Sequence, residues 1–396
     1  EPRRGGIADA GGHQPQRPER REHQGPGDVG RCHYRPGFHS DQGTRRALSA
    51  CQTGAVLTAS SDPLTRVHDL GMFDLDGVVY IGGAAVPGAA GHLERARGDG
   101  LRCAFITNNA ARTPSTVAAH LTELGVRAAP EDVVTSAQAA ARVLRERLGA
   151  DARVAVLGAE GLIEAVTAAG LVPVDVEAEA EAVVTGYGPE VLWSGVMRAA
   201  VRIRDGLWWV ASNTDASIPT TFGVAPGHGV LVDTLRRFAG VEPVVAGKPA
   251  RPLLDETIRR VGGNRPLMIG DRLDTDIEGA RTAGIDSLLV LTGVTGLPEL
   301  VAARPSERPT YLGVDLGSLR TAHPAPERRG AAWVLAGWEA TTEEGRLSVT
   351  GAGEADDWWR CVAACAWTHL DDHGTVVDVT GVHAPSGSDR PVASDT

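Results

Sequence analysis

From Leu70 onward, short apolar runs alternate with alanine-rich amphipathic segments. This alternation predicts an α/β fold in which a parallel sheet is flanked by helices. The runs expected to form its strands are residues 70–73, 101–106, 244–246, 267–269 and 287–291.

Each of the first four expected strands ends directly in a polar motif. In chain order the motifs are Asp74-Leu75-Asp76-Gly77, Thr107-Asn108-Asn109, Gly247-Lys248-Pro249 and Gly270-Asp271-Arg272-Leu273-Asp274-Thr275-Asp276. Ligand sites of open α/β sheets lie outside the carboxyl ends of the strands, so these motifs can converge on one crevice.

Lys248 is the only lysine in the chain, and the other 38 of the 39 lysine and arginine side chains are arginine. An ammonium is a compact point charge that suits a narrow pocket also holding phosphate or carboxylate, whereas a guanidinium is a broad fork. Chance in an arginine-rich chain is the simpler explanation for one isolated lysine. The neighbouring motifs favour a functional role.

The first motif places two carboxylates at a strand end. The Gly77 turn should let Asp74 and Asp76 diverge, so that one carboxylate can attack while the other transfers protons. Taken alone, the pattern also occurs in metal-dependent glycosyltransferases and in solvated loops.

The remaining motifs offer groups that suit a phosphate and a metal ion. Thr107 has a hydroxyl, and the turn through Asn108 and Asn109 exposes backbone N–H groups that can hold phosphate oxygens. Asp271 and Asp276 supply the hard oxygen ligands that Mg²⁺ prefers. The structural alternatives are a helix-capping turn and an acidic helix N-terminus.

Charge and composition restrict the partners. The net charge is −11, and the excess of arginine over acidic residues in the first fifty residues makes the rest more acidic still, which argues against non-specific nucleic-acid binding. No stretch approaches the ~18 apolar residues of a membrane helix. Five cysteines without a CxxC pair suit a reducing cytoplasm.

Composition also suggests where units begin and end. Residues 1–62 lack a hydrophobic period and are interpreted as a disordered or misassigned N-terminal extension. The segment between the second and third motifs is too long for one crossover. We therefore expect a second α/β domain at 137–242, inserted as a lid between core segments 63–136 and 243–320. Its strands are expected at 153–157, 182–185 and 208–211.

The C-terminal part differs from the rest of the chain in composition and in its hydrophobic pattern. Residues 321–330 are typical of a linker, and residues 331–384 form a small domain with five of the eight tryptophans. Helical spacing from Trp359 to Leu370 predicts a helix with a tryptophan-rich core face, and residues 374–380 are expected to form a strand. Residues 385–396 are interpreted as a disordered tail.

The ordered motifs DLDG, TNN, GKP and GDRLDTD resemble those of the haloacid dehalogenase superfamily of phosphohydrolases. DLDGVVY followed by Val86-Pro87-Gly88-Ala89 is similar to the class IIA branch, which contains p-nitrophenyl, phosphoglycolate and pyridoxal phosphate phosphatases. The match covers about residues 66–318. It implies a Rossmann-like core with an inserted α/β cap of the C2 type. The tryptophan-rich segment would add a small α+β domain.

The resemblance also implies the chemistry. Asp74 would be the nucleophile that forms an aspartyl-phosphate, and Asp76 would first donate and then accept a proton. Mg²⁺ would be held by the carboxylates of Asp74 and Asp271 and the backbone carbonyl of Asp76.

The same resemblance assigns the groups around the phosphate. Thr107, the Asn108–Asn109 turn and Lys248 would hold the phosphoryl oxygens. Asp276 would orient a metal-bound water from outside the ligand set.

Substrate choice is expected to depend on cap residues Asn213, Asp215 and Ile218. Ile218 stands where the pyridoxal phosphatases carry histidine, which ranks pyridoxal phosphate lower. The arginine-rich composition and tryptophan-rich C-terminal domain are similar to actinobacterial glycerol-3-phosphate phosphatases. The first expected substrate is therefore glycerol 3-phosphate, followed by 2-phosphoglycolate.

Several alternatives stay open at this point. A phosphotransferase would share the core residues, a DxD glycosyltransferase would use Asp74 and Asp76 with a sugar nucleotide, and a phosphometabolite-binding or assembly module would use the tryptophans. The expected partner is a small-molecule phosphate ester, with neither nucleic acid nor membrane. A homodimer remains an open alternative to a monomer.

Overall fold

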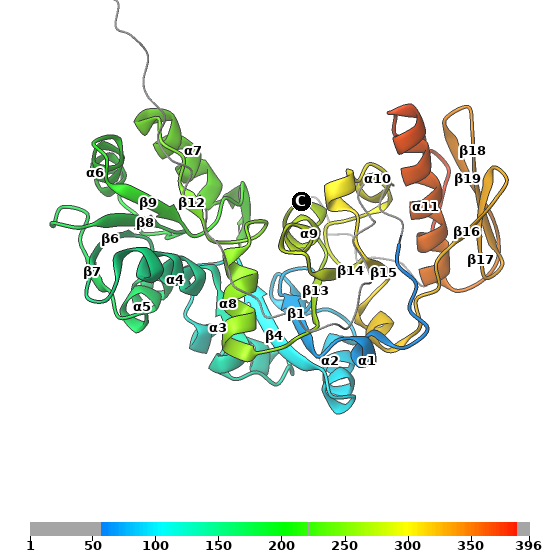
Figure 1. Cartoon of the computed structure of the whole chain (residues 1–396), viewed down its shortest axis with the longest axis horizontal. Helices are drawn as coiled ribbons and strands as arrows, with labels where there is room; N and C mark the ends of the chain where they lie inside the picture. The colour runs from blue at the N-terminus through cyan, green and yellow to red at the C-terminus, as the bar shows by residue number, and fades with distance from the viewer. Residues whose placement is uncertain (1–56, 221, 386–396) are drawn as a thin grey trace, which may run out of the picture. The chain divides into compact units, whose positions relative to one another are not determined.

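The computed structural model describes residues 57–220 and 222–385 (Figure 1). The expectation for residues 1–62 therefore falls mainly outside the described residues, as does that for the 385–396 tail. Within the described part, no helix combines the length and apolarity needed to cross a membrane.

The core is a six-stranded parallel sheet, as the sequence predicts. Its strands, in spatial order, are β15 (Tyr311–Gly313), β14 (Asp286–Val290), β13 (Pro266–Gly270), β1 (Leu70–Asp74), β4 (Arg102–Thr107) and β5 (Val133–Thr135). β1 lies near the centre, where Met72 pairs with Met268 on one side and Ala104 on the other. The carboxyl ends of β1, β4 and β13 therefore lie next to one another.

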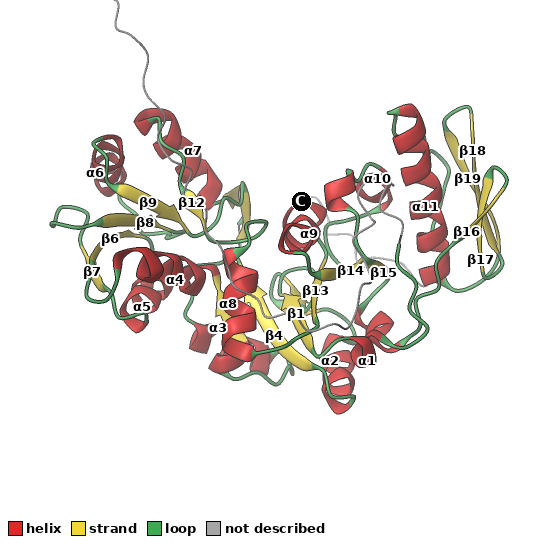
Figure 2. Cartoon of the chain, viewed as in Figure 1, coloured by secondary structure: helices red, strands yellow, loops and turns green. Residues whose placement is uncertain are grey.

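Helices accompany this sheet (Figure 2). They are α1 (Leu64–Val67), α2 (Ala89–Gly98), α3 (Pro114–Glu123), α4 (Ser136–Leu148), α8 (Pro252–Val261), α9 (Glu278–Ala283) and α10 (Leu297–Val301). Successive strand residues belong to different clusters: Phe73 packs in one buried cluster and Met72 in another. Both faces of the sheet are thus covered, as a parallel sheet requires.

The sequence explains where α3 and α4 begin. Thr113 precedes α3 and accepts a hydrogen bond from the backbone N–H of Thr116 at 3.2 Å, with Pro114 at the first helical position. Thr135 forms a capping box with Gln138 at the start of α4. α4 thus begins directly after β5, and α3 begins beyond the turn that follows β4.

A second parallel sheet is inserted between β5 and β13. Its spatial order is β12 (Val244–Val245), β9 (Trp208–Ala211), β8 (Ala182–Thr185), β6 (Arg153–Leu157) and β7 (Val172–Val174). With α5 (Glu160–Ala168), α6 (Trp193–Arg204) and α7 (His228–Ala239) it forms what we call the cap unit. The predicted strands 153–157, 182–185 and 208–211 are confirmed.

One strand lies in a different sheet from the one expected. The sequence places residues 244–246 in the core, but Val244 pairs with Val210 of β9 in the cap unit. Without this strand, the edge of β9 would expose unpaired backbone groups. The backbone N–H of Ala246 extends the pairing to Ala211 at 3.0 Å, so the third motif begins where the cap sheet ends.

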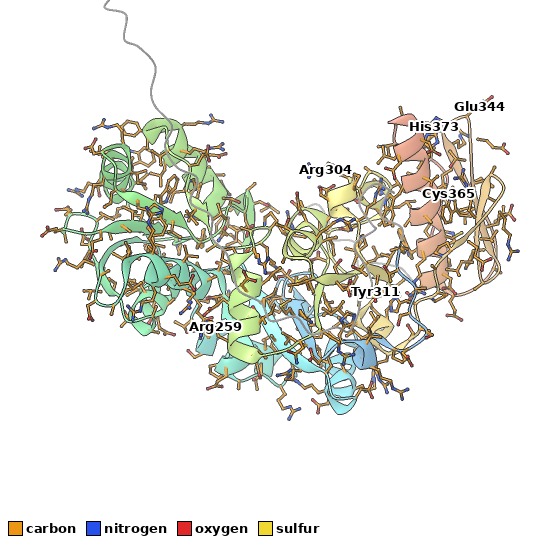
Figure 3. All side chains as sticks on the ribbon, in the orientation of Figure 1. Arg259, Arg304, Tyr311, Glu344, Cys365 and His373 are labelled. Carbon is orange, nitrogen blue, oxygen red and sulfur yellow. The ribbon has the colours of Figure 1, made fainter. Side chains whose placement is uncertain are left out.

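The C-terminal unit consists of an antiparallel sheet and one long helix. The strands are β16 (Glu327–Arg329), β17 (Ala332–Leu335), β18 (Trp338–Glu343) and β19 (Arg346–Gly351), and the helix is α11 (Ala355–His373). Trp358, Trp359 and Trp367 are buried, which confirms a core role for the tryptophan-rich face. Cys365, labelled on α11 in Figure 3, is also buried.

Two expectations for this unit are wrong. The segment interpreted as a linker contains β16. Residues 374–380 form no strand beyond one bridge between Asp378 and Arg346, because the left-handed Gly374, with φ 71°, ends α11 and turns the chain.

The C-terminal unit is attached to the core by partly buried polar contacts. Arg308 donates two hydrogen bonds of 2.7 Å to the Asp371 carboxylate on α11. Asp356 accepts a hydrogen bond of 2.8 Å from the backbone N–H of Val314, just after β15. The 57–62 segment is ordered here too, because Leu57 is buried and Ser60 forms a bridge with His323.

Candidate active site

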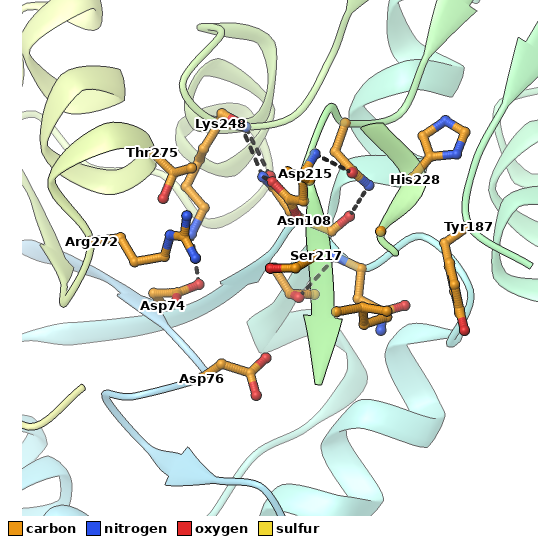
Figure 4. A pocket seen from close by; sticks show the side chains of 16 residues that line it. Asp74, Asp76, Asn108, Tyr187, Asp215, Ser217, His228, Lys248, Arg272 and Thr275 are labelled. Carbon is orange, nitrogen blue, oxygen red and sulfur yellow. Dashed lines mark hydrogen bonds and ion pairs between the residues drawn. The ribbon is translucent and has the colours of Figure 1, made fainter. Parts of the chain in front are cut away.

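All four motifs lie at one cavity of about 160 Å³. Figure 4 shows its lining side chains, which come from both the core and the cap unit. They are Asp74, Asp76, Thr107, Asn108, Asn109, Tyr187, Asn213, Asp215, Ala216, Ser217, Ile218, Gly227, His228, Lys248, Arg272 and Thr275.

Lys248 lies between two carboxylates. Its Nζ donates to Asp74 Oδ1 at 2.6 Å and to Asp276 Oδ1 at 2.7 Å, and the residue is only 2 % exposed. Burial lowers the pKa of the ammonium, but Asp276 and Asp74 outweigh it and hold the pKa above its ordinary value. Lys248 therefore stays cationic while it contacts Asp74 at the end of β1.

Asp271 completes a group of three buried carboxylates. One oxygen each from Asp74, Asp271 and Asp276 lies within 4.8 Å of the others. Burial raises the pKa of Asp74 and Asp271, and the neighbouring carboxylates raise both further. Three carboxylates with one ammonium leave excess negative charge, which a divalent cation would balance.

One oxygen of the Asp271 side chain is not engaged by the described residues. Its Oδ2 accepts a hydrogen bond of 2.6 Å from the Val294 backbone N–H. Its Oδ1 is buried, with no hydrogen-bond partner among the described residues. A Cβ at Gly77, which has φ 81°, or at Gly293 would overlap the carboxylate. The residues present thus fit Mg²⁺.

Asn108 connects the core to the cap unit. Its Oδ1 accepts from the Lys248 backbone N–H at 2.8 Å, and its Nδ2 donates to Asp215 Oδ1 at 2.9 Å. Its backbone carbonyl accepts from Asn213 Nδ2 at 2.7 Å and from Ser136 Oγ at 2.5 Å. The Asn108 side chain is therefore occupied in positioning its neighbours.

The turn after β4 is closed by its own local hydrogen bonds and also faces the cavity. Thr107 Oγ1 accepts a hydrogen bond of 3.0 Å from the Asn109 backbone N–H, and Asn109 Oδ1 accepts one of 2.8 Å from that of Ala111. These are local turn contacts, yet Thr107 and Asn109 also line the cavity. The Thr107 hydroxyl proton is still available for a ligand, because Oγ1 acts here as an acceptor.

The other predicted residues lie at the same cavity. Asp76 lines it outside the three-carboxylate group, and burial raises its pKa. Burial raises the pKa of Asp215 too. Ile218 is half-buried on the hairpin of β10 (Ser217–Thr220) and β11 (Gly223–Pro226). The cavity therefore brings together the predicted nucleophile, proton donor, phosphate groups and cap residues.

Sequence reasoning missed four residues of the lining. Tyr187 follows β8, and its position after a predicted strand was a usable signal. Arg272 and Thr275 belong to the fourth motif but were assigned no role. His228 lies in a glycine-rich run, residues 223–229, that follows the cap residues expected to govern substrate choice.

Comparisons with known proteins agree with this geometry. The family description haloacid dehalogenase-like hydrolase matches residues 71–172, and HAD-hydrolase-like matches residues 245–319. The D-glycerol 3-phosphate phosphatase of Mycobacterium tuberculosis is 44 % identical over 295 residues, covering 74 % of this chain and 82 % of the relative. The chain belongs to the haloacid dehalogenase-like hydrolase family.

Further members of this family show how much of the chain is shared. An acid sugar phosphatase of Staphylococcus haemolyticus is 34 % identical, covering 62 % of this chain and 92 % of the relative. The crystal structure of the Mycobacterium tuberculosis glycerol phosphate phosphatase in complex with magnesium has a TM-score of 0.71 and 42 % identity, covering 78 % and 93 % of the two chains. The crystal structure of 4-nitrophenylphosphatase from Thermotoga maritima has a TM-score of 0.61 and 29 % identity, and the match covers 65 % of this chain and 98 % of that one.

These findings confirm the predicted α/β fold and enzyme class. The chain is a phosphatase of the haloacid dehalogenase-like family, and the glycosyltransferase alternative is not favoured.

Proposed function

We propose that this phosphatase hydrolyses a small phosphate monoester with the help of Mg²⁺. The observation that carries the proposal is the contact of Lys248 with Asp74 and Asp276, beside an Asp271 oxygen that has no hydrogen-bond partner in the described part of the chain. Glycerol 3-phosphate is the first candidate, since the relative from Mycobacterium tuberculosis is named for it. 2-Phosphoglycolate is the second.

In the first step Asp74 attacks the phosphorus in line. A bond forms between its carboxylate oxygen and phosphorus, and the bond from phosphorus to the leaving-group oxygen breaks. Asp76 gives that oxygen a proton. The burial that raises the pKa of Asp76 supports this role, because it favours the protonated acid.

In the second step water releases the phosphate. Asp76, now a carboxylate, accepts a proton from the attacking water. The new bond joins the water oxygen to phosphorus, and the bond to the Asp74 oxygen breaks. Asp74 and Asp76 thereby return to their starting states.

The other groups balance charge and hold the phosphoryl oxygens. Thr107, the Asn108–Asn109 turn and Lys248 would donate to these oxygens. Bound Mg²⁺ would offset the repulsion between the anionic nucleophile and the anionic ester.

Three groups would hold the ion, while a fourth would act from outside. The ligands would be the carboxylates of Asp74 and Asp271 and the Asp76 backbone carbonyl. Asp276 would orient Lys248 and a metal-bound water.

The cap residues would contact the leaving group. Asn213 and Asp215 lie on the loop held by Asn108, and Ile218 offers an apolar surface beside them.

We further propose a cytoplasmic location, which the free buried thiols support. Size-exclusion chromatography would decide between monomer and homodimer.

A phosphate-release screen over small phosphoesters, with Mg²⁺ or with EDTA, tests the proposal. We expect Mg²⁺-dependent turnover of glycerol 3-phosphate. Asp74→Asn should abolish turnover without unfolding the chain, while the matched control Asp233→Asn on α7 retains it. Turnover by Asp74→Asn would contradict the mechanism, and transfer to added alcohols in place of water would indicate a phosphotransferase.

A further inference from the structure

A second cavity lies behind the substrate pocket. Its volume is about 290 Å³, and it shares Tyr187, Gly227 and His228 with that pocket. In Figure 4, His228 and Tyr187 lie on the side of the pocket away from Asp74. The rest of the second cavity is largely apolar, with contributions from Val191, Trp193, Val196, Val230 and Leu231.

His228 is held in place between the two cavities. It is 3 % exposed, and its Nε2 lies 3.2 Å from Thr185 Oγ1. The indole N–H of Trp209 donates to the same oxygen at 3.0 Å. Because an indole N–H only donates, the Thr185 hydroxyl proton is free to point toward His228 Nε2. The imidazole orientation therefore depends on two buried side chains of β8 and β9.

The backbone around His228 is equally restricted. A Cβ at Gly227 would overlap the carbonyl of Asp215, and one at Gly229 would overlap that of Thr214. The Gly229 backbone N–H also donates to the Asp215 carbonyl at 2.8 Å. The start of α7 thus packs directly on the loop that carries Asp215, so the backbone that carries the imidazole cannot shift without moving that loop.

Removing the imidazole would break few hydrogen bonds. In the part of the chain that the structure describes, His228 Nδ1 is buried without a hydrogen-bond partner. Burial lowers the pKa of the ring to about 4, so a neutral side chain fills this position at neutral pH. A smaller residue would leave Thr185 paired with Trp209 and would join two cavities that now share only a wall.

We propose that His228 sets the length of leaving group that the enzyme accepts. Its imidazole closes the substrate pocket opposite Asp74, so that a short polar leaving group fits and a longer apolar one is excluded. The excluded esters are those whose chain would otherwise reach Trp193 and Leu231. This inference rests on the proposed function and adds a residue that determines its substrate class.

The test compares glycerol 3-phosphate with n-hexyl phosphate. In His228→Ala, the ratio of kcat/KM for the hexyl ester to that for glycerol 3-phosphate should rise by about tenfold or more, the scale of discrimination in apolar pockets. His228→Phe keeps a ring and should leave the ratio close to that of the parent enzyme. Adding Val230→Trp to His228→Ala should refill the second cavity and reverse the gain.

Controls separate this inference from the proposed function. His369→Ala, a matched change on α11, should not alter the ratio. If His228→Ala fails to fold by circular dichroism, His228→Asn provides the shorter side chain with a hydrogen-bonding group for Thr185. An unchanged ratio in the folded variant, or a gain that Val230→Trp does not reverse, would overturn the role of His228. Absent turnover of glycerol 3-phosphate by the parent enzyme would instead count against the proposed substrate.

Discussion

Replacing Lys248 by arginine keeps the charge but should remove most of the activity. Nζ donates to Asp74 and Asp276 at 2.6 and 2.7 Å, and we find no third partner for it among residues 57–220 and 222–385. An ammonium has three N–H donors, so one is left for a phosphoryl oxygen. A guanidinium in a site that is 2 % exposed must displace its neighbours, at a cost of about 1–3 kcal/mol in folding free energy.

The loss of activity should exceed the loss of stability. Removing one well-placed donor from a transition state lowers kcat by about 10²–10³-fold, and we expect that range for Lys248→Arg. Lys248→Met, which leaves the buried carboxylates without their ammonium, should lower the free energy of unfolding by about 3–5 kcal/mol in EDTA. Phosphate release and urea unfolding measure the two effects. Near-parental turnover by Lys248→Arg would refute the assigned role of the lysine.

Three further outcomes follow from the contacts. Burial and the nearby Arg360 lower the pKa of His323 to about 4. The neutral His323 ring therefore makes its full contribution to the free energy of unfolding above pH 6.5, and this contribution is lost as the pH falls toward 4. Urea unfolding should show that His323→Gln loses about 3 kcal/mol less free energy of unfolding over that window than the parent chain, in which His228 adds a similar loss of its own. Gly77→Ala should cost about 1–2 kcal/mol of backbone strain and, because its Cβ overlaps Asp271, raise the Mg²⁺ concentration for half-maximal activity. Gly82→Ala, also at positive φ but with open space, should cost only the strain; equal Mg²⁺ requirements in both would contradict the reasoning. A chain ending at residue 320 should have a lower melting temperature, because the contacts to α11 are lost, and an unchanged melting temperature would show that the C-terminal unit is accessory.

Much of the site could be predicted from the sequence because it depends on local order. Apolar runs define strands, parallel strands share a polar edge, and the residues directly after β1, β4 and β13 must then meet. That reasoning brought Asp74, Thr107 and Asp271 together, and the structure agrees, since Asp74 lines the cavity with Thr107 and belongs to the three-carboxylate group with Asp271. The roles assigned to them remain proposals.

The remaining features depend on contacts between distant segments. Periodicity identifies residues 244–246 as a strand but not the sheet it joins, since an apolar run suits either edge. His228 and Tyr187 belong to the cavity only because α7 and the loop after β8 pack beside the Asp215 loop. The expected strand at 374–380 failed because Gly374 ends α11 in a left-handed turn.

The position of β12 has a consequence for building chimaeras between relatives. A cap exchanged at residue 242 would enter its new host without its own edge strand and would have to pair with a foreign one. A junction placed after Lys248 avoids this, but the donor then supplies the Lys248 ammonium while the host supplies its partners Asp74 and Asp276. Only Ala246 and Gly247 separate β12 from Lys248, so a transplant that also carries the ammonium has to match the host's carboxylates as well as the new substrate.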